Sequence, residues 1–209
     1  MTMWPLGLAV VGLASTQSVS RRAVLGAVAA GAALPHGMSS MATARVPGSE
    51  NVGEAVEQII AGRESLVKLQ KEWATYACVD KEGRACNIDA ARKILGGVAP
   101  QRGEAAIEVA KVTPLYRIDN AFAAVRKFSL NDEDGWGSKL DVEAFVEKSD
   151  DVVFALKKTD DSFYGVVFAS KGSTMIEGIY AEAKKAVDKS VVDLDTLLAQ
   201  LKDVGCPYV

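Results

Sequence analysis

The chain has 209 residues, and its 24 lysines and arginines nearly balance its 27 aspartates and glutamates, for a formal net charge of −3. Proteins that bind nucleic acid usually carry a basic excess, so this composition argues against that class of partner. A single histidine and three cysteines also leave few side chains for metal ligation or nucleophilic catalysis.

The N-terminal segment has the layout of an export signal. Arg21 and Arg22 precede a short apolar run rich in alanine and glycine, residues 23–34, and the small-x-small tripeptide from Ala42 to Ala44 follows. This is typical of a twin-arginine signal with a signal-peptidase site. The alternative, a stop-transfer helix, needs about twenty apolar residues, more than the run provides. We therefore expect removal of residues 1–44 and a single mature domain over residues 45–209.

A second apolar stretch, residues 4–14, precedes the two arginines, and no acidic residue occurs before Glu50. Simple bacterial twin-arginine signals open with a polar, basic stretch, so two signals in series fit this leader better than one. Two such signals are expected of a nuclear-encoded protein that must reach the thylakoid lumen of a complex plastid. The leader therefore predicts a lumenal location, with a bacterial periplasm as the alternative.

Charge is distributed unevenly over the mature chain. Without Arg21 and Arg22 the basic residues number 22 against 27 acidic ones, a net charge of −5. Every mature arginine lies before residue 128, and the remaining segment uses only lysine. Because the arginine fork suits docking onto carboxylates, this bias predicts a docking face in the first half. The candidate docking residues are Arg84, Arg92, Arg102, Arg117, Arg126 and Trp136.

Apolar periodicity predicts helices throughout. The expected helical segments are residues 52–77, 88–95, 103–111, 115–127, 142–167 and 176–201, with Asn87 as a cap and Gly96-Gly97 as a stop. Residues 128–139 are expected to form a loop, because Asp132, Asp134, Gly135 and Gly137 break helices there. No segment shows a convincing strand period. The economical fold is all-α, a four-helix up-down bundle with short extra helices in its first long connection.

The cysteines suggest one bridge. Cys78 and Cys86 lie eight residues apart across a connector, a spacing that permits a disulfide in an oxidising compartment. A zinc site is the competing interpretation, but His36 lies in the leader and the mature chain has no histidine. Cys206 is expected to be a free thiol.

Residues for catalysis or for cofactor binding are not evident. Loss of His36 removes histidine-dependent nucleophilic schemes. The acidic turn around Asp132 and Asp134 departs from a calcium loop, since Leu130 would occupy its first position. The pairs at residues 150–151 and 160–161 are expected to be solvated or capping carboxylates. We therefore predict a non-enzymatic protein with no cofactor and no metal. Of the two mature tryptophans, Trp73 is expected in the core and Trp136 at a partner.

One segment resembles a known family. The run from Leu69 to Cys78, then Cys86, then the run from Asn87 to Gly96 with Arg92, resembles the PsbQ-like extrinsic subunits of photosystem II found in diatoms and related algae. Residues 140–146 and the helix pair after them are similar to the second half of that family.

The resemblance implies a four-helix bundle docked on the lumenal side of photosystem II, with the photosystem core and other extrinsic subunits as partners. Such a subunit shields the oxygen-evolving centre and helps to retain calcium and chloride, and it is peripheral to the thylakoid membrane. Two alternatives stay open. One is a lumenal subunit or linker of photosystem I or its antenna. The other is a small cation-binding protein that uses carboxylates of residues 132–134 and 150–161.

Overall fold

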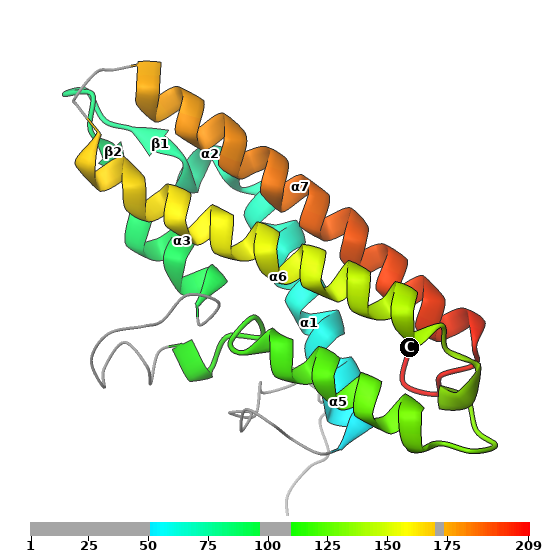
Figure 1. Cartoon of the computed structure of the whole chain (residues 1–209). Helices are drawn as coiled ribbons and strands as arrows, with labels where there is room; N and C mark the ends of the chain where they lie inside the picture. The colour runs from blue at the N-terminus through cyan, green and yellow to red at the C-terminus, as the bar shows by residue number, and fades with distance from the viewer. Residues whose placement is uncertain (1–50, 97–109, 170–173) are drawn as a thin grey trace, which may run out of the picture. The chain divides into compact units, whose positions relative to one another are not determined.

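The computed structural model describes residues 51–96, 110–169 and 174–209, and these residues are mostly helical (Figure 1). The predicted leader, with Arg21, Arg22, Ala42 and Ala44, lies outside them, and so does Arg102. The predicted helix over residues 103–111 is described only at its last two positions, so most of that prediction stays untested.

Helix α1 (Val52–Lys71) begins where the Asn51 side chain accepts a hydrogen bond of 2.9 Å from the Gly53 backbone N–H. Its buried face includes Val56, Ile59 and Leu66, at the spacing of an amphipathic helix. The sequence predicted one helix as far as residue 77. Instead the helix breaks at Glu72, and the short α2 (Trp73–Tyr76) follows.

A small hairpin follows α2. Strands β1 (Cys78–Val79) and β2 (Ala85–Cys86) pair antiparallel, and Cys78 and Cys86 are opposite each other in this ladder. The sequence predicted no strand of useful length, and these two strands of two residues each are too short to show a period. Helix α3 (Ile88–Leu95) comes next, and Gly96 ends it as predicted.

Helix α5 (Ile118–Asn131) corrects two boundaries. It begins three residues later than predicted, after Pro114, and it continues four residues into the segment predicted as a loop. The Ser129 hydroxyl donates to the Val125 carbonyl and the Asn131 amide to the Lys127 carbonyl, so polar side chains bond to their own helix there. A single 3₁₀ turn, η1 (Gly137–Lys139), forms later in the predicted loop.

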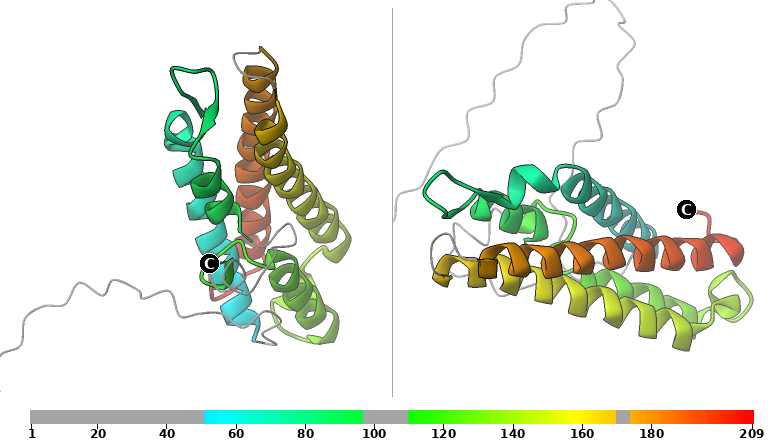
Figure 2. Two further views of the ribbon diagram at one scale, coloured as in Figure 1. Left: turned by 90° about the vertical axis from the view of Figure 1, so that its left-hand side faces the viewer. Right: turned by 90° about the horizontal axis from the view of Figure 1, so that it is seen from above.

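The two longest helices form the second half of the chain. Helix α6 (Val142–Gly165), capped by Asp141, passes into the 3₁₀ turn η2 (Val166–Phe168), and α7 (Thr174–Asp203) returns beside α6 in the opposite direction (Figures 1 and 2). Both helices occur where the sequence predicted them. Gly205, with φ of 82°, ends α7 in a Schellman motif, in which the Cys206 N–H donates to the Leu201 carbonyl.

The four long helices surround the core. Contacts link α1 with α5, α5 with α6, α6 with α7 and α7 with α1. The largest fully buried side chains come from all four and from the segments beside them: Ile59, Leu66, Leu69, Leu95, Leu115, Ile118, Phe145, Leu156, Phe163, Ile176, Leu194 and Leu197. The C-terminal tail also joins this packing, because a Cβ on Gly53 would lie 2.9 Å from Cε1 of Tyr208.

Candidate docking surface

The predicted docking arginines do not lie on one element. Arg84 is in the β1–β2 hairpin, Arg92 is on α3, and Arg117 and Arg126 are at the start and in the third turn of α5. Figures 1 and 2 show α5 well away from the hairpin. The arginine-rich half of the sequence therefore does not form one continuous arginine face among the described residues.

Arg92 has an internal partner. Its guanidinium donates to both carboxylate oxygens of Asp160 on α6, from Nε at 2.9 Å and from Nη2 at 3.1 Å. The Asp160 side chain is only 3% exposed and that of Arg92 27%. The hydrogen bond to Asp160 is the main cause of the raised pKa of Arg92. The expectation that Asp160 is a solvated carboxylate was wrong, because α3 covers it.

Arg63 forms a second ion pair between the first and the second half of the mature chain. Its Nε lies 2.8 Å from Oδ1 of Asp195 on α7, with both side chains partly exposed. Arg63 and Arg92, from the first half of the mature chain, thus bind carboxylates of its second half within one molecule. Part of the charge bias that suggested a docking face is therefore used in folding.

The other described arginines remain at the surface. Arg84 pairs with its neighbour Glu82 at 2.7 Å, and Arg117 lies 3.5 Å from Asp119. Arg126 is exposed, and no ion pair to it occurs among the described residues. Of the predicted set, Arg126 is the arginine best placed to bind a carboxylate of another molecule.

Trp136 packs within the molecule. Its ring stacks on that of Phe128, with centroids 4.9 Å apart, and it is half-buried against the core. The turn before it is held by Asp132, whose carboxylate accepts hydrogen bonds from the N–H groups of Gly135 at 3.0 Å and Gly137 at 2.8 Å. A contact between Trp136 and a partner stays a prediction.

The segment that carries the resemblance, residues 69–96, folds into a corner closed by a disulfide, which we call the closed corner. The predicted disulfide between Cys78 and Cys86 is present, with Cα atoms 5.3 Å apart, and Cys206 is free and buried. The Trp73 ring packs on Phe163 of α6 at 5.6 Å, and Trp73 is partly buried against the core and not enclosed in it as expected. Asn87 begins α3 with φ of 56°, but its side chain donates to the Thr75 carbonyl and caps no helix N–H.

An exposed apolar cluster lies where α6 ends and α7 begins. Four side chains form what we call the apolar end: Tyr164, Val167, Phe168 and Met175, which are 51%, 58%, 71% and 59% exposed. The Tyr164 and Phe168 rings meet edge to face at 5.1 Å, and the Arg92 guanidinium lies 5.2 Å from the centre of the Tyr164 ring. Val167 is the last residue of the segment predicted as helical, and it is exposed. The sequence does contain a signal for this exposure, because the apolar run from Tyr164 to Phe168 is too wide to be buried on one face of a helix.

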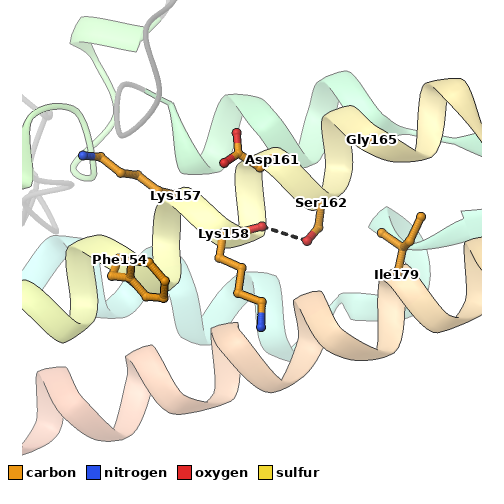
Figure 3. A pocket seen from close by; sticks show the side chains of 7 residues that line it. All are labelled: Phe154, Lys157, Lys158, Asp161, Ser162, Gly165 and Ile179. Carbon is orange, nitrogen blue, oxygen red and sulfur yellow. Dashed lines mark hydrogen bonds between the residues drawn. The ribbon is translucent and has the colours of Figure 1, made fainter.

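An open groove of about 560 Å³ lies on the outer side of α6 and α7 (Figure 3). Phe154 and Ile179 supply apolar side chains to it, and the Ser162 hydroxyl at its edge donates to the Lys158 carbonyl at 2.7 Å. Its remaining lining is Lys157, Lys158, Asp161 and Gly165. A Cβ added at Gly165 would have no atom within 4 Å, so this part of the groove is open to solvent.

Three of the carboxylates considered for cation binding are engaged elsewhere. Asp132 holds its turn, Asp160 binds Arg92, and Asp151 accepts from Lys189 at 2.9 Å. Within the described part of the chain, no group of three or more potential ligand side chains is arranged to hold a metal ion. None of the described helices combines the length and hydropathy needed to cross a bilayer.

Comparisons with known proteins give no match, either to a protein-family model, to a curated protein or to a solved structure.

Proposed function

We propose that the mature chain is a non-catalytic extrinsic subunit of photosystem II, a four-helix up-down bundle with α1, α5, α6 and α7 as its long helices. It docks on the lumenal side of the photosystem, where it shields the oxygen-evolving centre. The location is proposed from the leader, and the partner from the resemblance of residues 69–96.

The closed corner is the observation that supports this proposal most. The residues that carry the resemblance have structural partners: Cys78 bonds to Cys86, Trp73 packs on Phe163, and Arg92 clamps α3 onto α6. These contacts fix the positions of the residues in the closed corner. A docking subunit benefits from this, because a rigid surface loses less conformational entropy on binding.

Fractionation of thylakoids from the source organism tests the proposal. We expect the protein to co-purify with photosystem II particles, with a mature N-terminus at Arg45 by mass spectrometry. A wash at about 1 M salt should release it, because the Debye length there is only about 3 Å. Recovery with photosystem I particles would favour the alternative photosystem, and recovery only in the lumenal fluid would contradict docking altogether.

A charge reversal identifies the contact. Arg126→Glu should weaken rebinding to salt-washed photosystem II particles, because Arg126 is exposed and has no ion pair among the described residues. Lys202→Glu makes the same charge change at an exposed position of α7 and should rebind like the wild type. Equal rebinding of both variants would remove Arg126 from the proposed interface.

A further inference from the structure

We propose that the groove on the outer side of α6 and α7 docks a second copy of this chain, in a two-fold dimer whose α6 helices pack antiparallel. Four of its lining residues form what we call the α6 stripe: Phe154, Lys158, Asp161 and Gly165. They follow one another at intervals of four, three and four positions, which places them in one line along the helix. Figure 3 shows all four on the stretch of α6 that borders the groove.

The positions in the α6 stripe suit a two-fold arrangement. When two copies of a helix pack antiparallel across a two-fold axis, each residue before the axis faces the residue equally far after it in the other copy. With the axis level with the peptide bond between residues 159 and 160, Lys158 faces Asp161 of the second copy, and Phe154 faces its Gly165.

The outer pair of the α6 stripe matches in shape. Phe154 is 71% exposed, so its ring projects from α6 with little cover. Gly165 has no side chain, and a Cβ there would have no atom within 4 Å. Figure 3 shows Ile179 of α7 near this end of the groove. The Phe154 ring of one copy therefore fills the open end of the groove on the other, beside Ile179, and two-fold symmetry makes this contact twice.

The inner pair matches in charge. Asp161 is exposed, and no ion pair to it occurs among the described residues. Lys158 is half-exposed and has only a long contact, 3.9 Å, to Glu182. Two Lys158–Asp161 pairs can therefore form across the axis. A partner with a uniformly charged surface would be repelled at one of these positions, because the lysine and the aspartate lie within one turn of each other. A second copy in this register meets opposite charge at both.

The contact is short. Phe154 and Gly165 are eleven residues apart, which is about 17 Å along the helix. Helices about 10 Å across that touch over this length bury less than the ~800 Å² per partner of a standard interface, so the dimer is weak and reversible.

Sedimentation velocity of the mature chain, residues 45–209, over about 5–500 µM tests this proposal. The wild type should shift from monomer toward dimer as its concentration rises. Phe154→Ser should raise the dissociation constant about tenfold or more, because an apolar contact made twice is lost. Val192→Ser, at a side chain of α7 that is 63% exposed and outside the groove, is the matched control and should associate like the wild type.

A second variant fills the groove. Gly165→Leu should also prevent association, because the new side chain occupies the place of the incoming ring. It should not lower the stability of the monomer, because Gly165 has helical φ and ψ and a Cβ there would have no atom within 4 Å. Urea denaturation of the dilute protein checks this, and circular dichroism of Phe154→Ser should match the wild type.

An exchange of charges tests the antiparallel register. Lys158→Asp and Asp161→Lys should each raise the dissociation constant about tenfold, because like charges then face each other twice. An equimolar mixture of these two variants should dimerise like the wild type, since one native and one reversed pair form across the axis. The double variant, Lys158→Asp with Asp161→Lys, should do so as well.

A wild type that stays monomeric at every concentration would overturn the dimer, and so would equal association of the wild type, Phe154→Ser and Gly165→Leu. Charge variants that the mixture does not rescue would contradict the register. A monomeric wild type together with poor rebinding of Phe154→Ser to photosystem II particles would assign the groove to a photosystem protein instead. The dimer does not rest on the photosystem assignment, because only this chain enters the measurement.

Discussion

The carboxylate of Asp160 is almost completely buried, and Arg92 is its partner at 2.9 Å. Removal of one member of a buried pair leaves an uncompensated charge, so Arg92→Met should lower the free energy of unfolding by about 3 kcal/mol. Arg63→Met removes a partly exposed pair with Asp195 and should cost less than about 1 kcal/mol. Urea denaturation measures both, and equal losses would contradict the difference in burial.

Tyr180 is a buried polar residue whose substitution should not lower stability. Its ring is buried beside Phe163 at 5.7 Å, and its hydroxyl has no hydrogen-bond partner among the described residues. A buried hydroxyl without a partner carries a desolvation cost, so Tyr180→Phe should leave stability at pH 7 unchanged or raise it by about 1 kcal/mol. Thermal denaturation checks this. A clear loss of stability would mean that the hydroxyl has a partner.

Among the helices, Gly62 sets how closely α1 and α5 approach. A Cβ at this position would lie 2.9 Å from Cδ1 of Ile118 and 3.1 Å from Cδ2 of Leu115. Gly62→Val should therefore destabilise the protein by about 1–3 kcal/mol through overpacking. Gly178→Val adds the same side chain to α7 where no atom lies within 4 Å, and it should cost little. Similar losses in both variants, measured by urea denaturation, would show that helix propensity and not packing decides.

The hairpin depends on its disulfide, because two paired residues in each strand give little stability of their own. The double variant Cys78→Ser and Cys86→Ser should lose about 2–3 kcal/mol of unfolding free energy, from the entropy of the opened loop. Reductant should lower the thermal midpoint of the wild type and leave that of the double variant unchanged. An unchanged wild-type midpoint would argue against a structural role for the bridge.

Helix positions could be predicted because their signals are local. Apolar spacing located α1, α6 and α7, and Gly96 marked the end of α3. The extension of α5 to Asn131 was missed, since Ser129 and Asn131 are poor helix formers that here bond to carbonyls of their own helix. The partners of the arginines could not be predicted. Arg63 and Arg92 bind residues 132 and 68 positions away, and nothing in a local pattern specifies such pairs.

Over the whole molecule, ionisable groups define a range of pH in which stability is flat. Hydrogen bonds from lysines lower the pKa of Asp151 and of Glu182, so their contribution is lost as the pH falls through these lowered values. On the alkaline side, burial raises the pKa of Tyr180 and of Cys206, and Asp193 and Asp151 raise that of Lys189. Stability should therefore fall below about pH 4 and again above about pH 9.

Urea denaturation over a series of pH values measures both limits. Tyr180→Phe should flatten the alkaline side alone, because it removes one group whose ionisation favours the unfolded chain. An unchanged alkaline slope in this variant would assign the loss of stability to Cys206 and Lys189.

The contact between Gly53 and Tyr208 has a consequence for synthesis of the protein. The first turn of α1 packs against the last residues of the chain, and α1 also contacts α7. Contacts of such long sequence separation form late and slow down folding. A nascent chain lacks the surface that α1 needs until α7 and Tyr208 have left the ribosome, so α1 cannot reach its native packing before that segment has been synthesised.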